Sequence, residues 1–174
     1  SSMVYMAYNQ RSLFVTGVWT TVQLALAGTA IAFVLALLMV FLRIQEPDKR
    51  NNDFVKLIKI VANKFARFYI FVIRGTPMMV QAAVIYYGIA QFWHINLNRT
   101  VAALIIVSIN TGAYLAEVIR GGIISTPKGQ FEAASALGMT HNQRMWSIIL
   151  PQAIRNCLPS ITNEFIVNIK DTSV

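Results

Sequence analysis

The run Leu13–Leu42, LFVTGVWTTVQLALAGTAIAFVLALLMVFL, decides the fold class of this chain. It contains no Asp, Glu, Lys, Arg or His, and it is almost entirely apolar from Val22 onward. A helix that crosses the hydrocarbon core of a bilayer needs about 20 consecutive apolar residues. The run exceeds that length, so we predict a first membrane span over 13–42, with Trp19 as an interfacial anchor near its outer end.

The composition of the whole chain supports a membrane protein. Of the 174 residues 56% are hydrophobic and 13% are charged, and the mean hydropathy is +0.54. Soluble domains average about 25% charged residues. The chain has roughly half the charge that would coat a soluble surface, and we treat residues 1–174 as a single transmembrane domain.

The basic residues are distributed unevenly between the predicted connections. The chain carries 15 Lys and Arg against 7 Asp and Glu, a formal net charge of +8. Those that follow the first and third spans are Arg43, Lys49, Arg50, Lys56, Lys59, Lys64, Arg67, Arg120, Lys128 and Arg144. The connection between the second and third spans holds only His94 and Arg99. Because Lys and Arg are enriched in cytoplasmic loops, we predict an external N-terminus and cytoplasmic basic loops, and no nucleic-acid partner.

A second crossing is predicted over 54–93, interrupted in its middle. Lys56, Lys59, Asn63 and Arg67 recur at helical steps on one face, which predicts an amphipathic first half whose lower end lies among lipid headgroups. Arg74-Gly75-Thr76-Pro77 follows, and Pro77 lacks the backbone donor of a continuous helix. We therefore expect a kink or a break at this motif.

The second half predicts two further spans separated by a polar loop. A third span over 100–119 is expected to end at Gly121-Gly122, and the loop covers 125–150. Thr126 as N-cap and Pro127 at the first helical position predict the start of a loop helix, and Gly138 predicts its left-handed end. A second short helix should reach about Ile149. A fourth span over 151–170 is too polar to face lipid, so it should pack inside a bundle or line a cavity.

The sequence lacks the motifs that metal-dependent or ATP-hydrolysing enzymes use. His94 and His141 lie in different loops, which leaves no pair for a metal. The chain has no Gly-x4-Gly-Lys-Ser/Thr loop with which to bind ATP. We therefore predict no catalytic residue, no metal and no cofactor bound by this chain.

The polar loop contains a long spaced pattern. Its members are Glu132, Ala133, Ala134, Gly138, Ile148, Leu150 and Pro151. Physically the segment is a helix, a glycine turn and a second helix, joined to the last span through Leu150-Pro151. Both alanines would let another surface approach, so the loop could pass a soluble partner's motion into the membrane. Glu-Ala-Ala alone is common in plain amphipathic helices, and the full spacing is what favours a docking loop.

The full spacing resembles the cytoplasmic coupling loop of ABC importer permeases. Further segments resemble the polar amino acid branch of that family: 74–81 (RGTPMMVQ), 112–117 (GAYLAE) with 120–123 (RGGI), 127–130 (PKGQ) and 170–173 (KDTS). The resemblance covers essentially residues 13–174. It implies an all-α membrane bundle of the type I importer permease kind. Five transmembrane helices are expected in the full chain and about four here, because relatives continue past Ser173 into another apolar helix.

The resemblance also implies partners and a location. Members work as pairs of permease subunits, identical or homologous, in a bacterial inner or plasma membrane. Two cytoplasmic ATPase subunits, which hold ATP and Mg²⁺, dock on the coupling loops. An extracellular or periplasmic protein delivers the amino acid, which moves inward by alternating access. The seven loop residues would then contact the ATPase.

Candidate residues for the substrate pathway are the polar groups of the spans. They are Arg74, Thr76, Gln81, Glu117, Asn163 and Glu164. For Glu117 the alternative is a structural ion pair with Arg120 or Arg74, and for Arg74 it is an ion pair or a turn-fixing role. Two other functions stay open: a non-transporting scaffold or sensor that holds a cytoplasmic partner, and a channel or secondary transporter. Buried polar groups argue against a pure scaffold.

Overall fold

The computed structural model describes residues 11–44, 53–93 and 98–172, with the side chains of 89–93 left aside, and every element in these ranges is a helix. They are α2 (Arg11–Ile44), α3 (Asp53–Gly75), α4 (Met78–Trp93), α5 (Arg99–Ser125), α6 (Lys128–Ala136), α7 (His141–Arg144), the π-helical turn η1 (Met145–Ile149) and α8 (Leu150–Asp171). The predicted all-α class is confirmed. The predicted loop residues 45–52 and His94 lie outside the described residues.

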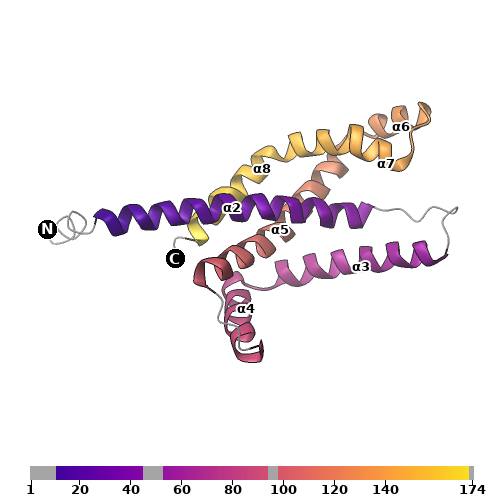
Figure 1. Ribbon diagram of the computed structural model, residues 1–174. Coiled ribbons are helices and arrows are strands. Elements are labelled where there is room, and N and C mark those ends of the chain that lie inside the picture. The colour runs from indigo at the N-terminus through magenta and orange to yellow at the C-terminus, as the bar shows by residue number, and fades with distance from the viewer. Residues whose placement is uncertain (1–10, 45–52, 94–97, 173–174) are drawn as a thin grey trace.

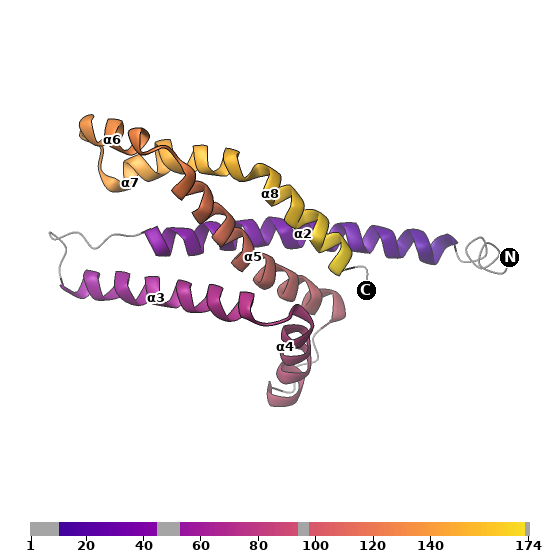
Figure 2. The ribbon, with the colours of Figure 1, turned by 180° about the vertical axis from the view of Figure 1, so that it is seen from behind.

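Helix α2 is the long axis of the molecule (Figure 1). Helix α5 crosses it diagonally, α8 lies along its other side, and α3 runs beside its C-terminal half (Figures 1 and 2). Within the described ranges, α2 and α5 are long and apolar enough to cross a membrane alone. Helices α3 and α4 pass the same test only as a pair, bent by 107° at their junction. The predicted break at Arg74–Pro77 is therefore present.

Small side chains bring α2 and α5 close together. The buried residues of α2 are Ala25, Gly28, Ala32, Ala36, Met39 and Val40, which recur mainly at steps of three and four. A Cβ built on Gly28 would lie 2.7 Å from Cγ1 of Val107 in α5, so the crossing leaves no room for a side chain there. Such small-residue contacts let helix backbones approach inside membranes, where dispersion replaces the hydrophobic effect. Leu115 and Ile119 of α5 complete the core.

Three boundaries differ from the prediction. Helix α5 runs through Gly121-Gly122 to Ser125, because both glycines are tolerated inside the helix. Thr126 is the C-cap of α5 and not the N-cap of α6: its hydroxyl donates to the Gly122 carbonyl at 3.1 Å. Pro127 precedes α6 without a side-chain cap. The predicted left-handed turn at Gly138 is confirmed, with φ at 72°.

Helix α8 begins at Leu150 with Pro151 in its first turn, close to the predicted start of the last span at 151, and no gap separates it from the loop helix. Helices α7, η1 and α8 follow one another without a gap from His141 to Asp171. The amide of Leu150 bonds to the Met145 carbonyl, five residues back, so the backbone widens just before the proline. A proline ring collides with the carbonyl four residues earlier in an α-helix. The π turn widens the backbone at that point, and a second proline, Pro159, lies inside α8.

Candidate functional site

The 125–150 segment forms a closed helix–turn–helix unit. The amide of Gly138 bonds to the Ser135 carbonyl at 3.0 Å, and the amide of Met139 bonds to the Ala134 carbonyl at 3.2 Å. This pair of bonds is a Schellman motif, which requires a left-handed residue at the position of Gly138. On the other side of the turn, Thr140 and Gln143 form a capping box. The chain direction between α6 and α7 is therefore set by local hydrogen bonds.

Arg144 braces α7 against α6. Its Nη1 donates to Oγ of Ser135 at 2.6 Å, and its guanidinium carbon lies 5.9 Å from the centre of the Phe131 ring. A further contact joins Nη2 to Nδ1 of His141 at 3.3 Å. Nε of Arg144 is buried without a hydrogen-bond partner in the described structure. One side chain thus ties both helices of the loop into a single body.

The loop is also attached to the end of α2. Nε2 of His141 lies 3.1 Å from the carbonyl oxygen of Ile44, the last residue of α2. The ring of Trp146 packs at 45° to that of Phe41, with 5.9 Å between centroids. A rotation of the loop would therefore act on α2 as well as on α8, which continues directly from the loop.

The predicted coupling residues divide into exposed and buried sets. Glu132, Ala133 and Pro151 are exposed, and Ile148 is partly buried. Ala134 is 1% exposed and Leu150 is 8% exposed, so both pack inside the chain. The expectation that Ala134 itself lets a partner approach is not met within this chain, because its methyl group already faces inward. Glu132 and Ala133 are the members of the Glu-Ala-Ala triplet that a partner can reach.

Gln81 sits at the corner between α3 and α4. Its Nε2 donates to the Ile73 carbonyl at 2.7 Å and lies 3.0 Å from the Thr76 carbonyl and 2.7 Å from the Thr76 hydroxyl. In an α-helix the Ile73 carbonyl would accept from the amide of residue 77, which is a proline. Gln81 supplies that missing donor. Its Oε1 accepts from Nδ2 of Asn110 in α5 at 3.0 Å.

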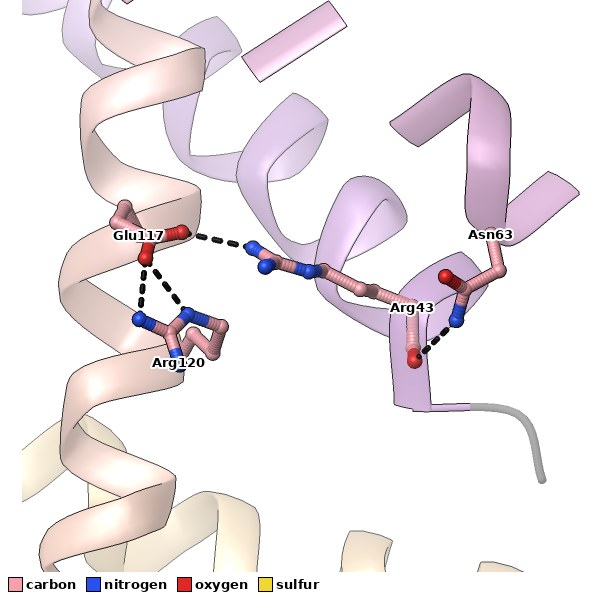
Figure 3. A network of polar contacts seen from close by, with 4 residues as sticks. All are labelled: Arg43, Asn63, Glu117 and Arg120. Atoms are coloured by element: carbon pink, nitrogen blue, oxygen red, sulfur yellow. Dashed lines mark hydrogen bonds and ion pairs between the residues drawn. The ribbon is translucent and has the colours of Figure 1, made fainter. Parts of the chain in front are cut away.

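Glu117 joins α5 to α2 (Figure 3). Its Oε2 accepts from Nη1 of Arg43 at 2.7 Å, and its Oε1 accepts from Nε of Arg120 at 2.7 Å. Asn63 of α3 donates to the backbone carbonyl of Arg43 at 2.8 Å. The alternative of an ion pair with Arg120 is therefore observed, whereas Arg74 takes no part in it. Arg43 is a partner that the sequence interpretation did not name.

Arg74 lies at the other end of the same surface. Its guanidinium is 5.2 Å from the centre of the Tyr114 ring, a cation–π contact between α3 and α5. Glu164 is partly buried on α8, and Asn163 beside it is exposed. The polar groups of Thr76 and Gln81 bond to one another and to the backbone of the corner.

Asn168 is a buried polar residue that joins three helices. Its Oδ1 accepts from the Thr111 hydroxyl of α5 at 2.7 Å, and its Nδ2 donates to the Thr29 hydroxyl of α2 at 2.9 Å. It is only 3% exposed. In the sequence, Asn168 is one of the polar residues of the predicted fourth span, 151–170. The sequence shows that Asn168 is polar, but it does not show that its partners are Thr111 and Thr29, which lie 57 and 139 residues away.

These features define a polytopic helical membrane protein that presents a rigid polar loop at one end of its bundle. Within the described ranges no group of three His, Cys, Asp or Glu residues could hold a metal ion. Residues 54–174 match the family model described as binding-protein-dependent transport system inner membrane component. The chain belongs to this family, which confirms the assignment made from the motifs, and it is a multi-pass inner-membrane protein.

Several similar proteins are permeases of named transport systems. The octopine transport system permease protein OccM of Rhizobium radiobacter is 45% identical over 117 residues, 63% of this chain and 48% of that protein. The L-cystine permease protein TcyB of Bacillus subtilis is 37% identical over 158 residues, 91% of this chain and 62% of that protein. The putative glutamine transport system permease protein GlnP of Rickettsia prowazekii is 35% identical over 173 residues, which cover 99% of this chain and 74% of that protein. The chain thus spans about half to three quarters of these relatives, which are named as permeases and not as enzymes.

Two solved structures share the architecture. A crystal structure of an amino acid ABC transporter with histidines matches 99% of this chain and 72% of its own, with a TM-score of 0.81 and 38% identity. An inward-facing MetNI methionine ABC transporter matches 91% of this chain and 70% of its own, with a TM-score of 0.71. At 19% identity the second match shows the fold alone. The type I importer permease fold expected from the sequence is confirmed.

Proposed function

We propose that this chain forms the membrane-spanning part of an ATP-binding-cassette importer that moves a polar amino acid into the cell. The relatives described above are named for octopine, L-cystine and glutamine, all of which carry amino acid groups. ATP and Mg²⁺ would be held by two separate ATPase subunits, since this sequence has no phosphate-binding loop. A second permease subunit and an external amino-acid-binding protein would complete the transporter.

The observation that carries the proposal is the braced loop of α6, α7 and η1. A lever transmits force only if it is stiff, and Arg144, the Gly138 turn and the Thr140 capping box fix the loop internally. Glu132 and Ala133 are exposed on the loop, where the ATPase would contact them. The loop then reaches the membrane by two connections, through Leu150-Pro151 into α8 and through His141 to the end of α2.

The proposed orientation places the loop in the cytoplasm and the N-terminus outside. Arg43 lies in the last turn of α2, and α6 begins with Lys128, so basic residues mark the loop end of the bundle. Cytoplasmic ends of membrane helices carry such an excess of Lys and Arg. This orientation would bring the loop to the compartment in which ATP is hydrolysed.

For the substrate pathway, the most suitable of the candidate residues are Arg74, Asn163 and Glu164. A zwitterionic amino acid needs a cation for its carboxylate and an anion for its ammonium group. Arg74 in the last turn of α3 supplies a cation, and Glu164, partly buried on α8, supplies an acidic group. Thr76, Gln81 and Glu117 already have internal partners, so we assign them to holding the pathway's walls.

The test is a substitution at the turn of the loop. Gly138→Val places a β-branched residue where φ is 72°, which a side chain adopts only at a cost of about 1–2 kcal/mol or more. We expect the full transporter to lose uptake per ATP hydrolysed, or to release its ATPase during purification. Gly121→Val is the matched control, because a Cβ at Gly121 also meets nothing within 4 Å and its φ is not left-handed.

The two variants separate the possible functions. If Gly138→Val leaves both uptake and ATPase binding unchanged, the coupling role of the loop is wrong. A complex that binds ATPase but never transports labelled amino acids after reconstitution would instead favour a scaffold or sensor. Uptake by the chain without any ATPase would favour a channel or secondary transporter.

A further inference from the structure

Helix α3 carries a basic and apolar surface that the other described residues leave exposed. Only Ala66 and Ile70 of α3 are buried. Phe68 is 66% exposed and Phe71 is 78% exposed. Lys64 and Arg67 beside them are exposed, and within the described residues neither has an ion-pair partner. Large apolar and charged side chains thus alternate on one accessible surface.

This surface continues into a groove between α3 and α5. Its lining includes Arg43, Arg67, Phe68, Phe71, Arg74 and Tyr114, together with Glu117. Glu117 is neutralised by Arg43 and Arg120, so it does not cancel the charge of Arg67. The groove lining therefore combines cationic and aromatic side chains.

One hydrogen bond indicates how deep in the membrane this surface of α3 lies. Asn63 of α3 donates to the carbonyl of Arg43 in the last turn of the apolar helix α2, so Asn63 marks the height at which α2 leaves the hydrocarbon. At 1.5 Å per residue, Lys64 lies about 2 Å and Arg67 about 6 Å along the axis from that height. Side chains on a helix lean toward its N-terminus, which in α3 is the direction of the water. Both cations therefore reach the headgroup layer, while Phe68 and Phe71 stay among acyl chains.

We propose that this exposed surface of α3 binds an anionic phospholipid, with its phosphate at Lys64 and Arg67 and an acyl chain along Phe68 and Phe71. Basic pockets between membrane helices and basic amphipathic helices attract anionic lipid headgroups. The inference rests on the membrane setting and orientation given under the proposed function, and it adds a ligand that transport itself does not require.

A second copy of this chain fits the same surface poorly. Two-fold pairing would place each residue near the corresponding region of its partner. Helix α3 carries Lys56, Lys59, Lys64, Arg67 and Arg74 against a single Asp53, so self-pairing would bring like charges together. An anionic lipid removes that repulsion and covers the phenylalanines as well.

The test measures lipid binding to the purified transporter by native mass spectrometry, without ATP or amino acid. Dioleoyl phosphatidylglycerol should bind more tightly than dioleoyl phosphatidylcholine. At about 1 kcal/mol for each basic residue near the membrane surface, Lys64→Gln with Arg67→Gln should weaken phosphatidylglycerol binding about 30-fold. Lys64→Arg with Arg67→Lys should retain it. The matched control is Arg99→Gln with Arg155→Gln, which removes two exposed cations from α5 and α8, outside the α3 surface, and should change nothing.

Four results would overturn the proposal. They are equal binding of the two lipids, equal loss in both Gln variants, displacement of the lipid by inorganic phosphate, and efficient disulfide formation between two permease subunits that carry Phe68→Cys. The lipid preference of the unsubstituted transporter is measured first, so the lipid site can be accepted or rejected even if a Gln variant fails to assemble. Since the assay needs no uptake, its failure would leave the transport proposal untouched, and a failed transport assay would leave the lipid site standing.

Discussion

The side chain of Gln81 donates to the carbonyl of Ile73 at 2.7 Å, the oxygen whose helical partner would have been the amide of Pro77. A residue eight positions further along the chain thus replaces a donor that the proline cannot provide. The replacement is possible because the chain bends by 107° at this point and folds the start of α4 back over the end of α3. The bend is therefore a stabilised corner of the structure.

We expect Gln81→Met to destabilise this corner. The substitution keeps a similar side-chain size but leaves the carbonyls of Ile73 and Thr76 and the side-chain amide of Asn110 without their partner. An orphaned buried polar group costs about 1–3 kcal/mol. The thermal unfolding midpoint of the purified transporter should fall. Gln23→Met is the control, since Gln23 is exposed on α2, and an equal fall in both variants would contradict the assignment.

Gly122→Ala is expected to separate α5 from α8. A Cβ at this position would lie 2.8 Å from the backbone oxygen of Ala153 and in contact with Sγ of Cys157. Backbone cannot move aside as a flexible side chain can, and overpacking typically costs about 1–3 kcal/mol. Reduced thermal stability and a lower yield of assembled complex would be the observations.

Gly121→Ala provides the matched comparison for this helix crossing. Its added methyl group meets nothing within 4 Å, so it gains helix propensity without a clash. Replacing a helical glycine by alanine is worth up to about 1 kcal/mol. We expect Gly122→Ala to lower the unfolding temperature and Gly121→Ala to raise it. Shifts in the same direction would show that the close approach of α5 and α8 at Gly122 is unimportant.

The sequence was informative where a single residue constrains its own backbone. Pro77 predicted the break between α3 and α4, and Gly138 predicted the left-handed turn, because a missing amide and a missing Cβ act locally. Thr126 misled, since a hydroxyl can cap either helix, and it closes α5. Pro151 marked the start of α8 correctly, but the π turn that joins α8 to the loop without a gap had no signal in the sequence.

The contacts that organise the candidate sites were beyond local patterns. Arg43 and Glu117 are 74 residues apart, and His141 and the Ile44 carbonyl are 97 apart. Only the packing of α2 against α5 and the loop decides which basic residue meets Glu117. Glu117 could be named from its place in an apolar span, whereas its partner required the tertiary structure.

Arg43 and Glu117 should behave as a coupled pair. In a double-mutant cycle with Arg43→Gln and Glu117→Gln, we expect a coupling free energy of about 1 kcal/mol, because the pair is only partly shielded from solvent. Uptake should fall in proportion to the loss of assembled complex in both single variants. If Glu117→Gln abolished uptake while assembly stayed intact, and Arg43→Gln did not, Glu117 would belong to the substrate pathway instead.

The last prediction concerns the stiffness of the loop. Arg144→Met removes the donor that holds Ser135, so α6 should open more readily from α7. A lost hydrogen bond worth about 1 kcal/mol corresponds to about fivefold faster amide exchange where exchange follows local opening. Hydrogen–deuterium exchange over residues 128–136 of the assembled transporter would show it, with α5 unchanged.

Two further variants show whether this acceleration comes from the brace. Ser135→Ala should raise exchange in α6 to a similar degree, and combining it with Arg144→Met should add little, because both substitutions remove one contact. Arg155→Met, which takes an exposed arginine from α8, should leave α6 as it was. Additive effects of Ser135→Ala and Arg144→Met would mean that the two residues stabilise the loop separately, and the braced lever would then lose its main structural support.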